Sequence, residues 1–159
     1  MKRFLVSLVP FVMVYAMECN SQTFVELNGV CFHISDNHTA SVERFLNATQ
    51  GSIPERIDWQ GEYYAVNAIA SHAFYCNFAM KQLVIPSTVK NIAQQAFVQC
   101  RSLRHLYLLC IEPPVADNNS FDGIDEKRCV LHVPYGTLQA YKKSIGWNRF
   151  KKIKEGKKP

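Results

Sequence analysis

Histidines, cysteines and carboxylates are the residues of this chain whose types could support catalysis or metal binding. The thirteen carboxylates are scattered, and the sequence holds no GxSxG, HExxH, P-loop or glycine-rich dinucleotide motif. An enzyme needs several groups that converge, and no spacing here indicates such a set. We therefore assign no catalytic residue and no cofactor. A hydrolase or metal-dependent enzyme is the least favoured functional alternative.

Two histidines, His105 and His132, are the best candidates for metal ligands. Both fall on outward positions of neighbouring predicted strands, but a zinc site needs at least one further ligand, and the sequence offers none nearby. We therefore predict no metal site and interpret both histidines as surface residues.

The six cysteines form no CxxC pair, which argues against a zinc ribbon. If the chain is exported, five of them would remain in an oxidising compartment, and an odd number cannot all pair internally. Cys100 follows the repeated Phe97 by three residues. We predict that Cys100 is a buried packing residue.

An internal repeat indicates the secondary structure on which these residues lie. Residues 66–88 align with residues 89–111 at a shift of 23, with seven apolar positions in register. A period of 20 to 50 residues is typical of solenoids, whose units bury their apolar sides by stacking. The recurring pairs are Val66 and Val89, Ile69 and Ile92, Ala73 and Ala96, Phe74 and Phe97, Met80 and Leu103, Leu83 and Leu106, and Ile85 and Leu108.

The repeat extends on both sides of this pair. Phe121 continues the phenylalanine position, and Leu131 follows Leu83 by 48 residues, which is two periods plus two inserted residues. Upstream, Ile53 precedes Ile85 by 32 residues, and residues 55–64 can absorb the excess as a turn and a strand. We predict a third coil and a first, irregular coil.

Short strands are predicted at residues 83–85 and 106–108, with the first and third residues of each pointing inward. In parallel register the outward positions form two rows across the coils. Aromatic and imidazole groups on a rigid sheet suit ligand contact, because ordering them costs little entropy. The candidate ligand-binding residues are Gln82, Val84, His105, Tyr107 and His132.

The two ends of the chain are predicted to cap the solenoid. Residues 24–35 indicate a hairpin around Asn28-Gly29, and Gln60-Gly61 indicates a second one. Between them, residues 39–54 are interpreted as one or two strands with a turn at residues 50–52. After Gly136 a helix is predicted that runs through Leu138, Ala140, Tyr141 and Ile145. Apolar residues would then close the far end; these are Trp147, Phe150 and Ile153.

A signal peptide is predicted over residues 1–21. Lys2 and Arg3 precede an apolar run at residues 4–17, which is too short to span a bilayer. Cleavage after Ala16 or after Ser21 remains open, as does a lipid anchor at Cys19. We expect an exported protein, secreted or on the cell surface, with no transmembrane segment in the mature chain.

Positive charge is concentrated at the C-terminus. Residues 139–159 hold eight basic residues and one acidic residue, a net charge of +7 against +5 for the whole chain. The rest of the chain is therefore near neutral. We interpret the end as a solvated, fraying tail and expect no nucleic-acid partner.

Three segments together resemble the BspA-like leucine-rich repeats of bacterial secreted and surface proteins. They are the lead-in IPERIDWQGEYYAVNAIASHAF, the repeats AFYCNFAMKQLVIPSTVKNIAQQAFVQCRSLRHLYL and the exit LHVPYGTLQAYKKSIGWNRFKKIKE. The likeness covers about residues 24–155. The repeat departs from the family at Cys76, which is one position early, at Asn77, where cysteine is usual, and at Met80, which replaces leucine.

This resemblance implies a β-rich leucine-rich repeat solenoid, a right-handed coil with a parallel sheet, with an N-terminal hairpin cap and a short C-terminal helical cap. The expected divisions after residue 21 are a cap and first irregular coil (22–65), the repeat coils (66–134) and a C-terminal cap with a basic tail (135–159). The resemblance implies a non-catalytic module that binds a protein, such as a host matrix protein. A glycan ligand, or a structural component of a surface assembly, stays an alternative. The oligomeric state is left open.

Overall fold

The computed structural model of the chain describes residues 15–19, 22–46 and 48–156. Most of the predicted leader, including the cleavage position after Ser21, therefore lies outside the described residues. Residues 15–19 form a strand, β1 (Tyr15–Cys19), that pairs antiparallel with the next strand. No helix among the described residues combines the length and the apolar character needed to cross a bilayer.

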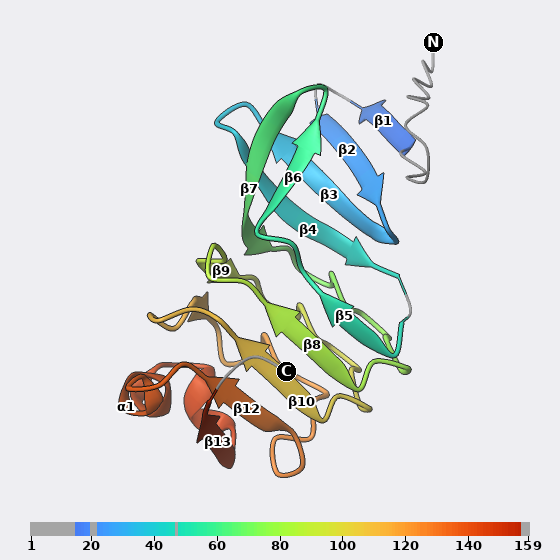
Figure 1. Cartoon of the computed structure of the whole chain (residues 1–159). Helices are drawn as coiled ribbons and strands as arrows, with labels where there is room; N and C mark the ends of the chain where they lie inside the picture. The colour runs from blue at the N-terminus through green and yellow to red at the C-terminus, as the bar shows by residue number, and fades with distance from the viewer. Residues whose placement is uncertain (1–14, 20–21, 47, 157–159) are drawn as a thin grey trace.

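The strands form two sheets. In Figure 1 the N-terminal strands lie at the top and the C-terminal cap lies at the bottom. The repeat sheet is parallel throughout and contains β5 (Gln50–Ser52), β8 (Gln82–Ile85), β10 (His105–Leu108), β12 (Val130–Val133) and β13 (Lys152–Glu155). The second sheet contains β1, β2 (Gln22–Leu27), β3 (Val30–Ser35), β4 (Thr39–Phe45), β6 (Arg56–Trp59), β7 (Glu62–Ile69), β9 (Asn91–Ile92) and β11 (Val115–Ala116).

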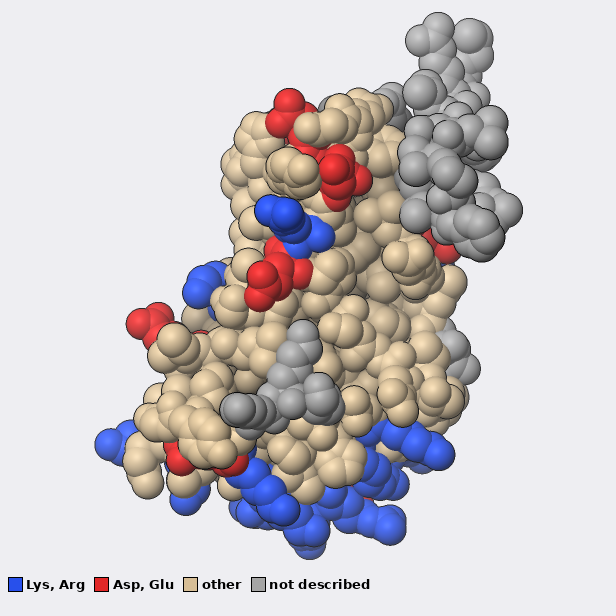
Figure 2. Space-filling model, in the orientation of Figure 1, with Lys and Arg blue, Asp and Glu red and all other residues tan. Residues whose placement is uncertain are grey.

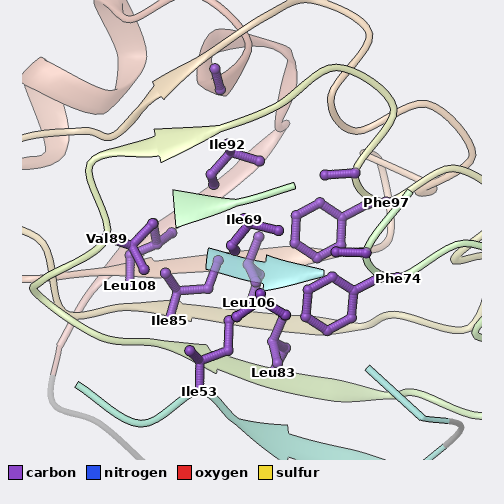
Figure 3. Packing of buried hydrophobic residues seen from close by; sticks show 14 of the residues in the cluster. Ile53, Ile69, Phe74, Leu83, Ile85, Val89, Ile92, Phe97, Leu106 and Leu108 are labelled. Carbon is purple, nitrogen blue, oxygen red and sulfur yellow. The ribbon is translucent and has the colours of Figure 1, made fainter. Parts of the chain in front are cut away.

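The register of the repeat sheet confirms the repeat found in the sequence. Gln82 lies beside His105, which is the shift of 23, and His105 lies beside Val130. All fourteen recurring apolar residues are buried, each at most 3% exposed. Figure 3 labels several of them, including Phe74, Phe97 and Leu106, whose side chains point into one interior between the sheets. The chain is therefore a solenoid whose core is continuous from coil to coil.

A column of aromatic rings runs through the turns that connect the two sheets. The ring centroids of Phe74 and Phe97 are 4.7 Å apart, and those of Phe97 and Phe121 are 5.5 Å apart. Phe45 stacks on the N-terminal end of the column, and Trp147 packs on the C-terminal end. Phe74 and Phe97 lie in the turns at residues 71–76 and 94–99, which contain no helix.

The N-terminal part contains both predicted hairpins. Asn28 and Gly29 connect β2 to β3, and Gln60 and Gly61 connect β6 to β7, with positive φ at all four residues. The predicted turn at residues 50–52 is wrong. These residues form β5, because pairing with β8 and the packing of Phe45 against Gly51 compensate for the weak strand propensity of a Gln-Gly-Ser segment.

The C-terminal part is more ordered than predicted. A helix, α1 (Leu138–Lys143), and a 3₁₀ turn, η1 (Trp147–Arg149), precede β13, which pairs with β12. The prediction of a fraying tail is therefore wrong as far as Glu155. Trp147 and Phe150 are buried and Ile153 packs on the core, as predicted. The helix ends at Lys143, so Ile145 lies beyond the helix in which it was predicted and is 63% exposed.

Ion pairs hold this cap to the preceding connection. Arg149 pairs with Glu126 at 2.5 Å and with Asp122 at 3.1 Å, and its guanidinium also donates to the backbone oxygen of Asn118. One of the basic residues assigned to the tail therefore anchors the cap.

Five cysteines whose side chains are described are free thiols, and three of them, Cys100, Cys110 and Cys129, are buried. The Cys100 thiol donates to the backbone oxygen of Phe74, and that of Cys110 donates to the backbone oxygen of Pro86. Burial raises the pKa of Cys100 to about 12 and that of Cys110 to about 11. Cys100 is thus a packing residue, as predicted, and these thiols are protonated and unreactive at neutral pH.

Candidate functional site

The outer face of the repeat sheet carries the residues that the sequence analysis singled out. Side chains alternate along each strand, so register alone aligns the outward residues of all five strands in two rows. The first row is Gln50, Gln82, His105, Val130 and Lys152. The second row is Ser52, Val84, Tyr107, His132 and Lys154.

Three rings from two strands pack together at the centre of this face. The Tyr107 and His132 rings stack with centroids 4.2 Å apart and an interplanar angle of 12°. The Nδ1 atom of His105 and the Nε2 atom of His132 are 3.1 Å apart, a hydrogen-bond distance across the diagonal between β10 and β12. We call these three residues the aromatic triad.

The surroundings of His132 disfavour its positively charged form. Burial lowers the pKa of His132 below its usual 6.5, and the charges of His105 and Lys154 lower it further. A neutral His132 can share the hydrogen bond with His105, in which one ring nitrogen donates and the other accepts. The triad therefore offers aromatic area together with hydrogen-bonding nitrogens at neutral pH.

The other two predicted site residues, Val84 and Gln82, lie beside the triad and are not part of it. Val84 is only 5% exposed, so it cannot offer the outward contact area expected of it. It lies beside Tyr107 and Ser52 in the second row, where neighbouring side chains cover it. Gln82 is half-buried beside His105 and borders the triad.

The structure adds residues that the sequence analysis did not place on this face. Gln50 and Ser52 were assigned to a turn, and Lys152 and Lys154 to a solvated tail. A weak signal existed for each pair. Ile53 is in register with Ile85, which sets the alternation of β5, and the alternating Lys-Ile-Lys-Glu of β13 resembles a half-buried strand.

Charge is unevenly distributed along the stack. Figure 2 shows lysine and arginine side chains gathered at the C-terminal end, around the starts of the lower repeat strands, and acidic side chains mainly near β6 and β7. The outer face therefore changes from neutral at β5 to basic at β13, where Lys152 and Lys154 extend the two rows.

The described residues contain no group of three or more histidine, cysteine or carboxylate side chains placed to hold a metal ion. His105 and His132 are used in a hydrogen bond to each other.

No protein-family model and no curated protein sequence matches this chain. Solved structures do match its fold. A leucine-rich repeat protein from Bacteroides capillosus aligns with a TM-score of 0.58 and 18% identity, over 84% of this chain and 99% of that one. A leucine-rich cell surface protein from Faecalibacterium prausnitzii aligns with a TM-score of 0.52 and 18% identity, over 83% of this chain and 32% of that one. The chain is thus a leucine-rich repeat solenoid with the fold of these bacterial proteins.

Proposed function

We propose that this protein is an exported, non-catalytic binding module, and that the outer face of its repeat sheet contacts a protein or glycan ligand. The aromatic triad carries the proposal. Its rings are held by stacking and by a cross-strand hydrogen bond, so a ligand would meet a surface that is already ordered.

Export is supported by the predicted leader and by the description of the Faecalibacterium prausnitzii structure as a cell surface protein. Tyrosine and histidine rings on a solenoid surface are suited to recognition, because they combine apolar area with polar atoms. A matrix protein is one ligand of this kind, and a glycan is another.

The experiment is a binding assay against immobilised extracellular matrix proteins and a panel of neutral and acidic glycans. We expect the double variant Tyr107→Ala, His132→Ala to weaken binding by about fivefold or more, which corresponds to about 1 kcal/mol. Tyr75→Ala is the matched control, since Tyr75 is 57% exposed on a turn away from this face. It should bind like the unmodified protein.

A charge-based mechanism makes a different prediction. Reversal of Lys151, Lys152 and Lys154 to glutamate would then abolish binding, and added salt would do the same. Full binding by the double variant, with loss in the charge-reversed one, would move the site to the C-terminal end. Self-association of the protein without any ligand would favour the structural alternative.

A further inference from the structure

A cleft of about 860 Å³ lies between the N-terminal part of the second sheet and β5, the first strand of the repeat sheet. Its volume is in the range of ordinary ligand sites. It is separate from the aromatic triad, because its lining comes mainly from β2, β3, β5 and β6, and it shares only Gln50 and Ser52 with the two rows of the outer face. The apolar part of the lining includes Leu27, Phe32, Phe45, Ile57 and Trp59.

Two strands border the cleft with consecutive residues. All four residues of β6 and all three of β5 line it. Side chains of consecutive strand residues point to opposite faces, so a strand lines a space in this way when it turns its edge toward that space. Within the described chain, β6 pairs only with β7 and β5 pairs only with β8. Both strands therefore present an unpaired edge to the cleft.

The backbone register identifies the groups on the free edge of β6. Val66 N donates to Glu55 O at 2.9 Å, and Arg56 pairs with Ala65, whose own N–H is directed to His38 O in the other direction. In an antiparallel ladder the hydrogen-bonded pairs alternate with unbonded ones. Arg56 and Asp58 therefore turn their N–H and C=O groups away from β7 and toward the cleft.

The same reasoning applies to β5. Lys81 N donates to Thr49 O at 2.8 Å, and Ile53 N donates to Val84 O at 3.0 Å. Residues at odd positions of this segment thus face β8, and Gln50 and Ser52 direct their backbone groups to the opposite side. The cleft combines backbone donors and acceptors at strand spacing with an apolar lining.

We propose that this cleft binds an extended peptide segment of a partner protein, which adds as a strand to the free edge of β6 and places an apolar side chain against Leu27, Phe45 and Trp59. Strand addition takes its affinity from main-chain hydrogen bonds and its specificity from pockets for alternate side chains. The edge is recessed in a cleft, which admits a single extended segment more readily than the edge of a folded sheet.

The charges of the lining favour an uncharged segment. Arg56 and Asp58 are the two charged residues in it, and their charges are opposite. The guanidinium of Arg56 also lies 4.8 Å from the centroid of the Tyr63 ring, on the β6–β7 hairpin itself. A segment with alternating apolar and neutral polar residues fits these surroundings best.

To test the proposal, random displayed peptides are selected for binding to the immobilised full chain. The peptides are about seven residues long, like an ordinary strand. Enriched peptides are synthesised, and their binding is followed by calorimetry and by tryptophan fluorescence. Trp59 is partly exposed and lines the cleft, whereas Trp147 is fully buried, so a change in fluorescence on binding reports Trp59. We expect peptides with an alternating apolar pattern that perturb this fluorescence.

The decisive variant is Asp58→Pro, with Asp58→Ala as its matched control. Proline removes the N–H that faces the cleft without removing a hydrogen bond to β7, and alanine keeps that N–H while removing the carboxylate. We expect binding about tenfold weaker or more in Asp58→Pro and within about twofold of the original in Asp58→Ala. Circular dichroism and a melting curve show whether the proline variant is folded.

A test that needs no protein variant uses peptides N-methylated at alternate residues, which cannot donate to a strand edge. If the peptide adds as a strand, methylation of one set of alternate residues should abolish binding, and methylation of the other set should leave binding intact. Equal binding of all methylated forms, or no enriched peptide that distinguishes the two Asp58 variants, overturns the proposal. A shift of Trp59 fluorescence with a neutral oligosaccharide such as cellohexaose, and with no peptide, also overturns it.

Discussion

His132 is the residue on which the interactions of the outer face converge. Its ring stacks on Tyr107, and its Nε2 atom lies within hydrogen-bond distance of the Nδ1 atom of His105. The charge of Lys154 on β13 contributes to lowering its pKa. These contacts favour the neutral imidazole. The residue therefore suits recognition near neutral pH, and its protonation should work against the folded state.

The first prediction follows from the lowered pKa of His132. Below pH 6.5 the unfolded chain binds a proton at this residue that the folded chain resists. Its contribution to the free energy of unfolding is complete above pH 6.5, and it falls as the pH drops from there toward the lower folded pKa. Urea unfolding between about pH 7.5 and about pH 5 should show this loss.

The matched variant for this measurement is His132→Gln, which keeps a polar side chain but does not titrate. Carboxylates and the other histidines also contribute to the pH profile, so the difference between the two profiles is the quantity to compare. The decrease in stability should be smaller in His132→Gln. An identical pH dependence in both proteins would contradict the assignment.

The second prediction concerns Gly123, where the turn of one coil approaches the previous coil. A Cβ atom added there would lie 2.4 Å from the backbone nitrogen of Gln99, and the residue has a φ of +94°. Gly61 has a similar φ of +84° but no heavy atom within 4 Å of an added Cβ. Gly123→Ala should therefore destabilise the protein more than Gly61→Ala, by about 1–3 kcal/mol of overpacking.

Urea denaturation of the two glycine variants separates the effects. Both pay the cost of a left-handed conformation, so the difference between them isolates the close approach of the two turns. Equal destabilisation would show that the turn at residues 118–123 does not pack on the turn at residues 94–99 as described.

At the scale of elements, the coils are held together by two kinds of ladder. Backbone hydrogen bonds join successive strands, and the aromatic column joins successive turns. Each coil buries its apolar residues only because its neighbours cover them, so stability should depend strongly on a side chain that contacts two neighbours.

Phe97 provides the third prediction. It is fully buried between Phe74 and Phe121, and Phe97→Ala should lower the free energy of unfolding by about 3–5 kcal/mol. Phe78→Ala is the matched control, because Phe78 is 54% exposed and should change stability by about 0.5 kcal/mol or less. Chemical denaturation measures both, and an unchanged midpoint for Phe97→Ala would refute the repeat packing.

At the scale of the whole molecule, the solenoid has two ends that need covering. The N-terminal strands extend the second sheet beyond β7, and the C-terminal end is closed by α1, η1 and β13. Tyr141 and Trp147 of that cap are fully buried, and their side chains donate to the backbone oxygens of Cys110 and Pro114. The cap is therefore part of the core.

The fourth prediction is that deletion of residues 133–159 abolishes soluble, monomeric protein. The deletion removes both buried aromatic residues and uncovers the edge of β12. Size-exclusion chromatography with light scattering measures the outcome. The double variant Lys142→Ala, Lys143→Ala is the control for lost positive charge, since both side chains are exposed on α1, and it should remain soluble. A monomeric, cooperatively melting deletion variant would contradict the role of the cap.

The repeat, its inward residues and the two outward rows from β8 to β12 could be predicted from the amino-acid sequence. A period of 23 residues fixes the register of successive coils, and alternation along a strand then fixes which side chains point outward. The hairpins at Asn28-Gly29 and Gln60-Gly61 were also local, because those residues readily adopt the positive φ of tight turns.

The strands β5 and β13, the burial of Val84 and the cleft could not be predicted from the sequence, because they depend on contacts made in the folded protein. A three-residue segment with glycine at its centre has no strand signal of its own, and it becomes a strand because β8 pairs with it and Phe45 packs over Gly51. The contact between His105 and His132, and the free edges of β5 and β6, likewise depend on partners far along the chain. Parallel pairing is non-local, so these features follow from the assembled coils and not from any single stretch of sequence.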